Sequence, residues 1–161
     1  MKNKVYIIFL IVFLIVVGLG IIILFNNKNK EQNKISMISI NNIRINQKAT
    51  KKMKKIVLDA DHLYEYNYVG FDINNDGYIK KVVFYSFESG EQFYGINDAK
   101  VKYKDKRLTK VEDFNSVLGK GEEKVDDKSP SYKYIKYKED NYELTLTLYN
   151  ENIINIKILK K

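Results

Sequence analysis

Four residues near the middle of the chain have types and spacing that could hold a calcium ion. They lie in the segment FDINNDGYIKKV, where Asp72, Asn74, Asp76 and Gly77 occupy positions like those of an EF-hand loop. A loop that starts at Asp72 needs a bidentate glutamate at its twelfth position, but that position is Val83. The flanking residues also alternate as strands do. We therefore predict a tight hairpin turn here, and metal binding by Asp72, Asn74 and Asp76 is the alternative.

Residues typical of catalytic sites are sparse. The single histidine, His62, has no cysteine partner in the chain and no G-x-S-x-G serine nearby, so no catalytic triad is predicted. The segment LGKGEE lacks the Ser or Thr that a phosphate loop needs after Lys120. Two pairs of acids lie in the polar segment GEEKVDDKSPS, where solvated charge is the default: Glu122-Glu123 and Asp126-Asp127. We predict no catalytic residue, no cofactor beyond that alternative calcium, and no enzyme activity.

The last third of the chain predicts one short helix. Thr109 and Glu112 form a capping box of the Ser/Thr-x-x-Glu kind, which marks a helix start. Gly119 is placed to take the left-handed conformation that commonly ends a helix. The residues between them put an apolar stripe at helical spacing: Val111, Phe114, Val117 and Leu118.

Strict alternation of apolar and polar residues follows this helix. From Tyr142 to Tyr149 leucine alternates with threonine, and isoleucine recurs at every second position from Ile154 to Ile158. Together with the preceding YKYIKY, these segments predict a three-stranded antiparallel meander. The helix should pack on this sheet through a shared core of five residues: Phe114, Leu118, Leu144, Leu146 and Ile156.

A similar order of elements occurs earlier in the chain. The segment KATKKMKKIVLD places Ala49, Met53, Ile56 and Val57 on one helical face, and the strand candidates YEYNYVGFDI and YIKKVVFYSF follow it. Two short segments, NNIRIN and YGINDAKV, introduce the two units as strand or linker. This order predicts an internal duplication, with repeat one at about 43–90 and repeat two at about 95–159. The alternative is two unrelated α+β halves.

The N-terminal region contains a long apolar run, VYIIFLIVFLIVVGLGIIILF, at residues 5–25. As a helix it would be about 31 Å long, enough for a hydrocarbon core of about 30 Å. It is longer than the core of a cleaved signal peptide and no small-x-small site follows it, so an uncleaved signal anchor is predicted. The lysines on its two sides are nearly balanced, and the short MKNK favours an N-terminus inside the cell.

The predicted fold class is therefore α+β, with an N-terminal transmembrane helix followed by a small domain of two helix-plus-antiparallel-sheet repeats. Residues 1–4 form a cytoplasmic n-region, 5–25 the transmembrane signal anchor, 26–42 a basic polar linker and 43–161 an extracytoplasmic domain. The expected location is the bacterial cell membrane, with a single pass. Since the chain has no cysteine, it cannot be a lipoprotein and cannot form a disulfide.

Charge is distributed unevenly along the chain. Residues 1–55 carry eleven Lys or Arg against one acid, whereas residues 56–161 carry seventeen against nineteen. Basic residues beside an apolar run are typical of contact with an anionic membrane surface. Nucleic-acid binding would need basic residues clustered on the folded domain itself, and that domain is slightly acidic. We predict no nucleic-acid partner.

The helix, the LGKG segment and the sheet ending in YELTLTLYNENIINIKI resemble a unit found in two protein families. These are the β-lactamase-inhibitor-protein fold and the small outer-membrane assembly lipoprotein of the BamE type (SmpA/OmlA). The resemblance covers about residues 43–159 and implies a binding module without chemistry that holds a partner protein on a concave sheet. The disulfides and the lipidation cysteine of those families are absent, and the first repeat has VLD at Val57–Asp59 where the second has LGK. No contact residues transfer.

Two kinds of function follow from these patterns. The first is a membrane-anchored, extracytoplasmic, non-catalytic module of adaptor or inhibitor type that binds an unknown envelope protein, for which an exposed row of tyrosines would be suitable. The second is a cell-envelope binder of cations or anionic wall polymer, through the basic linker and the Asp72–Asp76 hairpin. Neither pattern indicates an oligomeric state.

Overall fold

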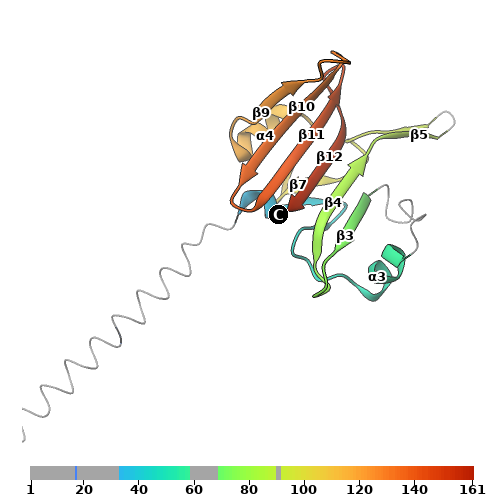
Figure 1. Ribbon diagram of the computed structural model, residues 1–161, viewed down its shortest axis with the longest axis vertical. Helices are drawn as coiled ribbons and strands as arrows, with labels where there is room; N and C mark the ends of the chain where they lie inside the picture. Colours follow the sequence, from blue (N-terminus) through green and yellow to red (C-terminus); the bar gives the residue numbers. More distant parts are fainter. Residues whose placement is uncertain (1–16, 18–32, 59–68, 90–91) are drawn as a thin grey trace, which may run out of the picture. The chain divides into compact units, whose positions relative to one another are not determined.

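Antiparallel strands make up most of the structure (Figure 1), a computed structural model that describes residue 17 and residues 33–58, 69–89 and 92–161. At 55–58, 87–89 and 92–93 it describes the backbone alone. Asn33–Lys161 form one compact unit, distinct from Met1–Gln32. The elements below all belong to Asn33–Lys161.

The largest sheet has six antiparallel strands in the order β3-β4-β12-β11-β10-β9. In chain order these strands are β3 (Val69–Ile73), β4 (Ile79–Tyr85), β9 (Glu122–Val125), β10 (Tyr132–Glu139), β11 (Tyr142–Tyr149) and β12 (Asn152–Lys160). Tight turns join β10 to β11 and β11 to β12. Asp140 has φ 52° in the first turn, and Asn150 and Glu151 have φ 46° and 66° in the second. In the second turn, positive φ at both central residues gives the twist that a two-residue hairpin needs.

A four-stranded sheet, in the order β2-β1-β7-β8, joins two hairpins that are far apart in the sequence. The first consists of β1 (Ile38–Ile40) and β2 (Ile43–Arg44), and the second of β7 (Val101–Tyr103) and β8 (Lys106–Arg107). Strands β1 and β7 pair antiparallel at the centre. Asn41 and Asn42, with φ 51° and 66°, form the first turn, because asparagine tolerates positive φ. A separate hairpin pairs β5 (Phe87–Ser89) with β6 (Gln92–Tyr94).

The helices of the described ranges are short: α2 (Lys34–Met37), α3 (Lys51–Leu58) and α4 (Val111–Leu118). Asn33 caps α2, since its side-chain oxygen accepts a hydrogen bond from the Ser36 N–H at 3.2 Å. Helix α4 ends at Gly119, whose φ of 82° and ψ of −179° suit glycine alone. In Figure 1, α4 and β7 lie behind the six-stranded sheet.

The core lies between the six-stranded sheet and the elements behind it. Leu144, Leu146 and Ile156 of the large sheet share one buried cluster with Val101 of the small sheet and Phe114 of α4. Burying a side chain of this size contributes about 1.5–3 kcal/mol relative to leaving it exposed. Both sheets and α4 therefore depend on the same apolar cluster for stability.

Several elements predicted from periodicity are confirmed. The helix predicted from the apolar stripe spans Val111–Leu118, and the three-stranded meander is β10, β11 and β12. Phe114 is fully buried in the predicted cluster, and Leu118 packs against it in a partly buried position. In the first predicted helix Ala49 and Met53 are buried, whereas the side chains of Ile56 and Val57 lie outside the described part.

The predicted capping box is wrong by one residue. Lys110 is the N-cap of α4, and the residue that reaches back is Asp113, not Glu112. The Asp113 carboxylate accepts hydrogen bonds from the backbone N–H groups of Thr109 at 3.0 Å and Lys110 at 3.2 Å. The Thr109 N–H contributes most to lowering the pKa of Asp113. Thr109 thus lies one position before the cap and still belongs to its hydrogen-bond network.

The predicted α+β class with two helix-plus-sheet repeats is also wrong, because the fold is mainly antiparallel β with few helices. Segments taken as linker or loop form strands: β1 lies in the predicted linker 26–42, and β9 lies in the predicted polar loop. The strands of the two predicted repeats also join one sheet through β4 and β12. Such pairing covers strand edges that separate small sheets would expose.

The prediction of a single-pass membrane protein is corrected as well. Within the described ranges, no helix has both the length and the apolar character needed to cross a membrane. The predicted signal anchor at residues 5–25 lies outside the described residues, apart from residue 17. The described ranges therefore do not support the predicted membrane anchor, the bacterial cell membrane location or the extracytoplasmic placement.

Candidate binding face

Alternation along the strands gives the six-stranded sheet two chemically different faces. On β11, Leu144, Leu146 and Leu148 are buried in the core, and the residues between them point to the other side. Directly paired residues on neighbouring strands share a face. We call the outward set on β9 to β12, with the adjacent Tyr85, the open face: Glu122, Lys124, Tyr132, Tyr134, Lys136, Lys138, Glu143, Thr145, Thr147, Tyr149, Asn152, Asn155, Lys157, Leu159 and Tyr85.

Tyrosine dominates one end of the open face. Tyr132 and Tyr149 pair across β10 and β11, with ring centroids 5.0 Å apart and planes tilted by 50°. Tyr149 is 43% exposed and Tyr85 is 53% exposed. Tyr134 lies in the next row and its hydroxyl reaches the Asp126 carboxylate at 3.4 Å. These rings combine apolar area with polar edges, a combination that is enriched at protein interfaces.

The row beside the Tyr132–Tyr149 pair has two small polar side chains at its centre, Thr147 and Asn155. Across the strands, Tyr134 pairs with Thr147, Thr147 with Asn155, and Asn155 with Tyr85. The Asn155 amide donates to the Phe84 carbonyl oxygen at 2.9 Å, which fixes its orientation. Hydroxyl groups here can donate or accept a hydrogen bond from a bound molecule.

The opposite end of the open face contains Glu143, which pairs with two lysines. Glu143 is nearly buried, and its two oxygens contact the amines of Lys161 at 2.8 Å and Lys136 at 3.4 Å. The Lys161 hydrogen bond is the main cause that lowers the pKa of Glu143, and Lys136 lowers it further. Lys138 pairs with Glu122 at 3.3 Å. These five charges, three amines and two carboxylates, are largely paired within the protein.

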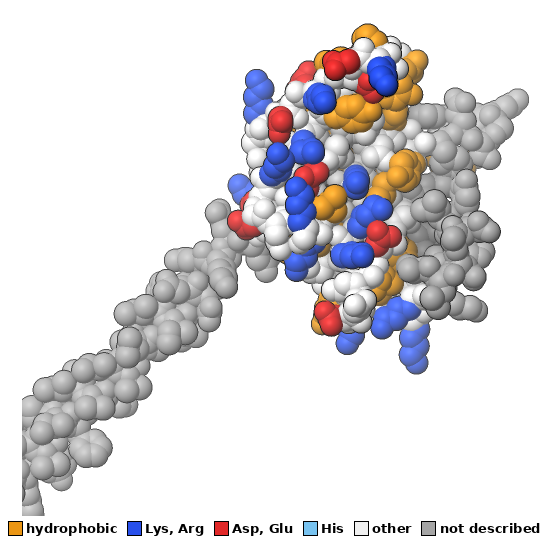
Figure 2. Space-filling model, in the orientation of Figure 1, with side chains coloured by type: hydrophobic (Ala, Val, Ile, Leu, Met, Phe, Trp, Pro, Cys, Tyr) orange, Lys and Arg blue, Asp and Glu red, His pale blue; other side chains and the backbone are white. Residues whose placement is uncertain are grey.

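Two other lysines of the open face differ from these. Lys124 on β9 and Lys157 on β12 are exposed, and neither forms a salt bridge with any residue in the described part of the chain. Figure 2 shows lysine and apolar side chains interspersed over this side of the unit. The open face therefore has free positive charge beside aromatic and hydroxyl groups.

Asp72 and Asn74, two residues of the alternative calcium site, already form an ion pair or hydrogen bonds within the protein. Asp72 on β3 pairs with Lys81 on β4 at 3.3 Å. The side-chain oxygen of Asn74 accepts the Tyr78 N–H at 2.8 Å, and the Asn74 carbonyl accepts the Gly77 N–H at 2.9 Å. Gly77 has φ 83°. The segment is a tight turn, and no metal-binding group of three or more His, Cys, Asp or Glu occurs among the described residues.

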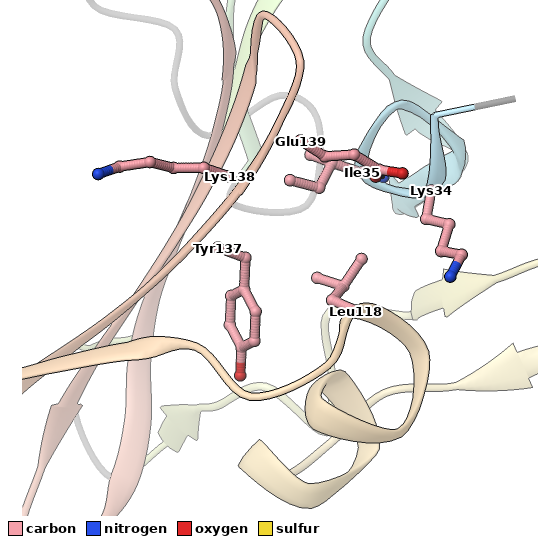
Figure 3. A pocket seen from close by; sticks show the side chains of 6 residues that line it. All are labelled: Lys34, Ile35, Leu118, Tyr137, Lys138 and Glu139. Atoms are coloured by element: carbon pink, nitrogen blue, oxygen red, sulfur yellow. Dashed lines mark hydrogen bonds between the residues drawn. The ribbon is translucent and has the colours of Figure 1, made fainter.

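A small pocket lies where α2 meets α4 and β10 (Figure 3). Its volume is about 120 Å³, and six residues line it: Lys34, Ile35, Leu118, Tyr137, Lys138 and Glu139. The Tyr137 hydroxyl donates to the Asn115 side chain at 2.9 Å, and Glu139 accepts the Ile35 N–H at 3.1 Å. Burial, with a smaller contribution from Glu112, raises the pKa of Tyr137 to about 12. In Figure 3 the Lys138 side chain extends away from Leu118 and Ile35.

The other residues considered from sequence are not brought together into a site. His62 lies outside the described residues. Glu122 and Glu123 point to opposite sides of β9, and Glu123 pairs with Lys133 at 3.1 Å. Gly121, two residues after the predicted helix end at Gly119, lies so close to β10 that an added Cβ would be 2.5 Å from the Ile135 Cγ2. That glycine serves close packing, not phosphate binding.

Sequence reasoning missed the extent of the open face because β9 was taken as a loop. A signal was present: Glu-Glu-Lys-Val ends in a β-branched residue, but charged residues hide the alternation typical of a strand.

Comparison with known proteins finds no matching family model, no matching curated protein and no matching solved structure. The resemblance to the β-lactamase-inhibitor-protein fold and to the BamE type stays a prediction.

Proposed function

We propose that the unit Asn33–Lys161 is a non-catalytic protein-binding module that holds its partner on the open face of the six-stranded sheet. The exposed tyrosines at one end of this face are the observation that supports it most. Tyr149 and Tyr85 are 43% and 53% exposed, although both lie on strands of the six-stranded sheet. Covering such rings with a partner removes apolar area from water at about 25 cal/mol per Å².

The pocket is a less suitable place for a ligand than the open face. Its volume of about 120 Å³ is below the range of about 300–1,000 Å³ that is common for small-molecule sites. The Tyr137 hydroxyl and the Glu139 carboxylate, which could orient a substrate, already bond to other groups of the protein. This geometry supports a surface function over a catalytic one.

The hairpin is also a weaker candidate than the open face. Cation binding by Asp72, Asn74 and Asp76 would compete with the Lys81 salt bridge and with the Asn74 hydrogen bond to Tyr78. Breaking both contacts costs free energy and would weaken the affinity of the hairpin for a cation. Binding of cations or of an anionic polymer at this hairpin therefore remains only an alternative.

Position-specific crosslinking tests the proposal. A photoreactive phenylalanine analogue replaces Thr147 or Tyr149 in the full chain, and irradiation follows in cells of the native host. We expect a discrete protein adduct from both positions. Lys104, an exposed residue in the turn between β7 and β8, is the matched control and should give none. Equal adducts from all three positions, or an adduct from Lys104 alone, would refute the assignment of the open face.

A further inference from the structure

We propose that the partner presents an acidic peptide segment to the open face, with two carboxylates that pair with Lys124 and Lys157. This inference rests on the proposed function and names the chemistry of the partner. It starts from the difference between these two lysines and Lys136 and Lys138, whose charges are already paired within the protein. Of the four lysines on the open face, Lys136 and Lys138 pair with Glu143 and Glu122, whereas Lys124 and Lys157 have no ion-pair partner among the described residues.

The strand register fixes how far apart these lysines lie. Lys124 stands on β9 in the row of Tyr134, Thr147 and Asn155, and Lys157 stands on β12 two residues from Asn155. Three strand spacings of about 4.8 Å and two residues of about 3.3 Å place the two Cα atoms about 16 Å apart. An extended segment covers that distance in about five residues. Carboxylates four to six residues apart could therefore reach both lysines together.

The surface between the lysines suits a polypeptide. Thr145, Thr147 and Tyr134 offer hydroxyl groups, which can bond to backbone N–H and C=O groups of a bound segment. The Tyr132–Tyr149 pair borders this surface and offers an apolar contact. Acidic residues of the segment would provide specificity and a faster association rate, as complementary charges do at other interfaces.

A nucleic-acid strand fits this surface less well, although lysines and tyrosines are common in sites for single strands. Phosphates would repeat along the whole contact, whereas only two lysines are free. The Tyr132 and Tyr149 rings are tilted against one another instead of offering parallel stacking surfaces.

Selection from a displayed library of random 12-residue peptides, on immobilised full chain, tests the inference. We expect enrichment of Asp or Glu pairs four to six residues apart. A selected peptide labelled with fluorescein is then titrated by anisotropy. Lys124→Glu and Lys157→Glu should each weaken binding at least fivefold, and replacing one peptide acid with Lys should restore binding to one of them. The control, Lys102→Glu on β7, is exposed and should change binding less than twofold.

The outcomes separate this inference from the proposed function. Selected peptides without acidic enrichment, whose binding depends on Tyr149 but not on either lysine, would overturn the inference and leave the proposed function standing. Selection of no peptide, or tighter binding of a twelve-nucleotide oligo-dT than of any selected peptide, would also overturn it. Lys124→Gln and Lys157→Gln, checked for unchanged melting, separate loss of charge from loss of folding.

Discussion

Gly77 shows at the scale of a single residue how the hairpin between β3 and β4 is built. Its φ of 83° is costly for a residue with a Cβ, and a Cβ there would also meet the Lys54 amine at 3.0 Å. We expect Gly77→Ala to lower the free energy of unfolding by about 1 kcal/mol or more. Thermal or urea melting of the full chain measures this. Asn75→Ala, in the same turn, is the control and should melt close to the parent protein.

Calcium distinguishes the turn from a metal site in the same hairpin. A bound ion would stabilise the fold by about 2.7 kcal/mol at a hundredfold excess over Kd. We predict that millimolar calcium leaves the melting temperature unchanged, because Lys81 and the Tyr78 N–H already occupy oxygens of Asp72 and Asn74. A calcium-dependent rise of several degrees that disappears in Asp76→Asn would show that the hairpin binds metal.

Glu143 should make stability depend on pH in the acid range. Its pKa is lowered in the folded protein, first by Lys161 and then by Lys136. A group with a lowered folded pKa contributes stability above its unfolded pKa of about 4.3, and this contribution is lost as pH falls through the folded value. We expect Glu143→Gln to flatten part of the decrease in melting temperature between about pH 5 and pH 2. Thr145→Ala, a neutral change on the same strand, should keep the full decrease.

At the scale of elements, α4 packs on the six-stranded sheet through one aromatic side chain. Phe114 is fully buried, and its ring lies 6.5 Å from that of Tyr137 on β10. Phe114→Ala should cost about 3–5 kcal/mol, because it leaves a cavity that the surrounding sheet cannot close. Chemical denaturation of the full chain gives this value. If Phe114→Ala melts like the exposed control Glu112→Ala, α4 does not pack on the sheet as described.

The elements that were predictable from sequence are those whose buried apolar residues recur at regular strand or helix spacing. Leucine at alternate positions identified β11, and the spacing of Val111, Phe114 and Leu118 identified α4. The small sheet was predicted only in part, because the segments NNIRIN and YGINDAKV were left open as strand or linker. Its strands are short, and β1 gains stability from pairing with β7, more than 50 residues away in the chain. Long-range pairing of this kind overrides local propensity.

The open face could be predicted only in part for the same physical reason. Tyrosines at alternate positions suggested a binding surface, but the pairing of Tyr132 with Tyr149 and the isolation of Lys157 depend on strand register. The β-bulge between Thr147 and Leu148 shifts that register, and no sequence pattern marks it. That Lys124 and Lys157 lack ion-pair partners among the described residues could therefore be recognised only from the folded sheet.

For the whole molecule, the central claim is that one face of the sheet binds a protein partner. The most direct measurement compares how much of the crosslinked partner binds to the parent protein, to Tyr149→Ala and to Tyr78→Ala. Tyr78 is 41% exposed but lies in the hairpin next to β4, outside the open face. Removing an aromatic anchor at a binding centre commonly costs about 2 kcal/mol or more. We predict that Tyr149→Ala weakens binding at least tenfold while Tyr78→Ala stays within twofold of the parent, and equal binding by all three proteins would contradict the claim.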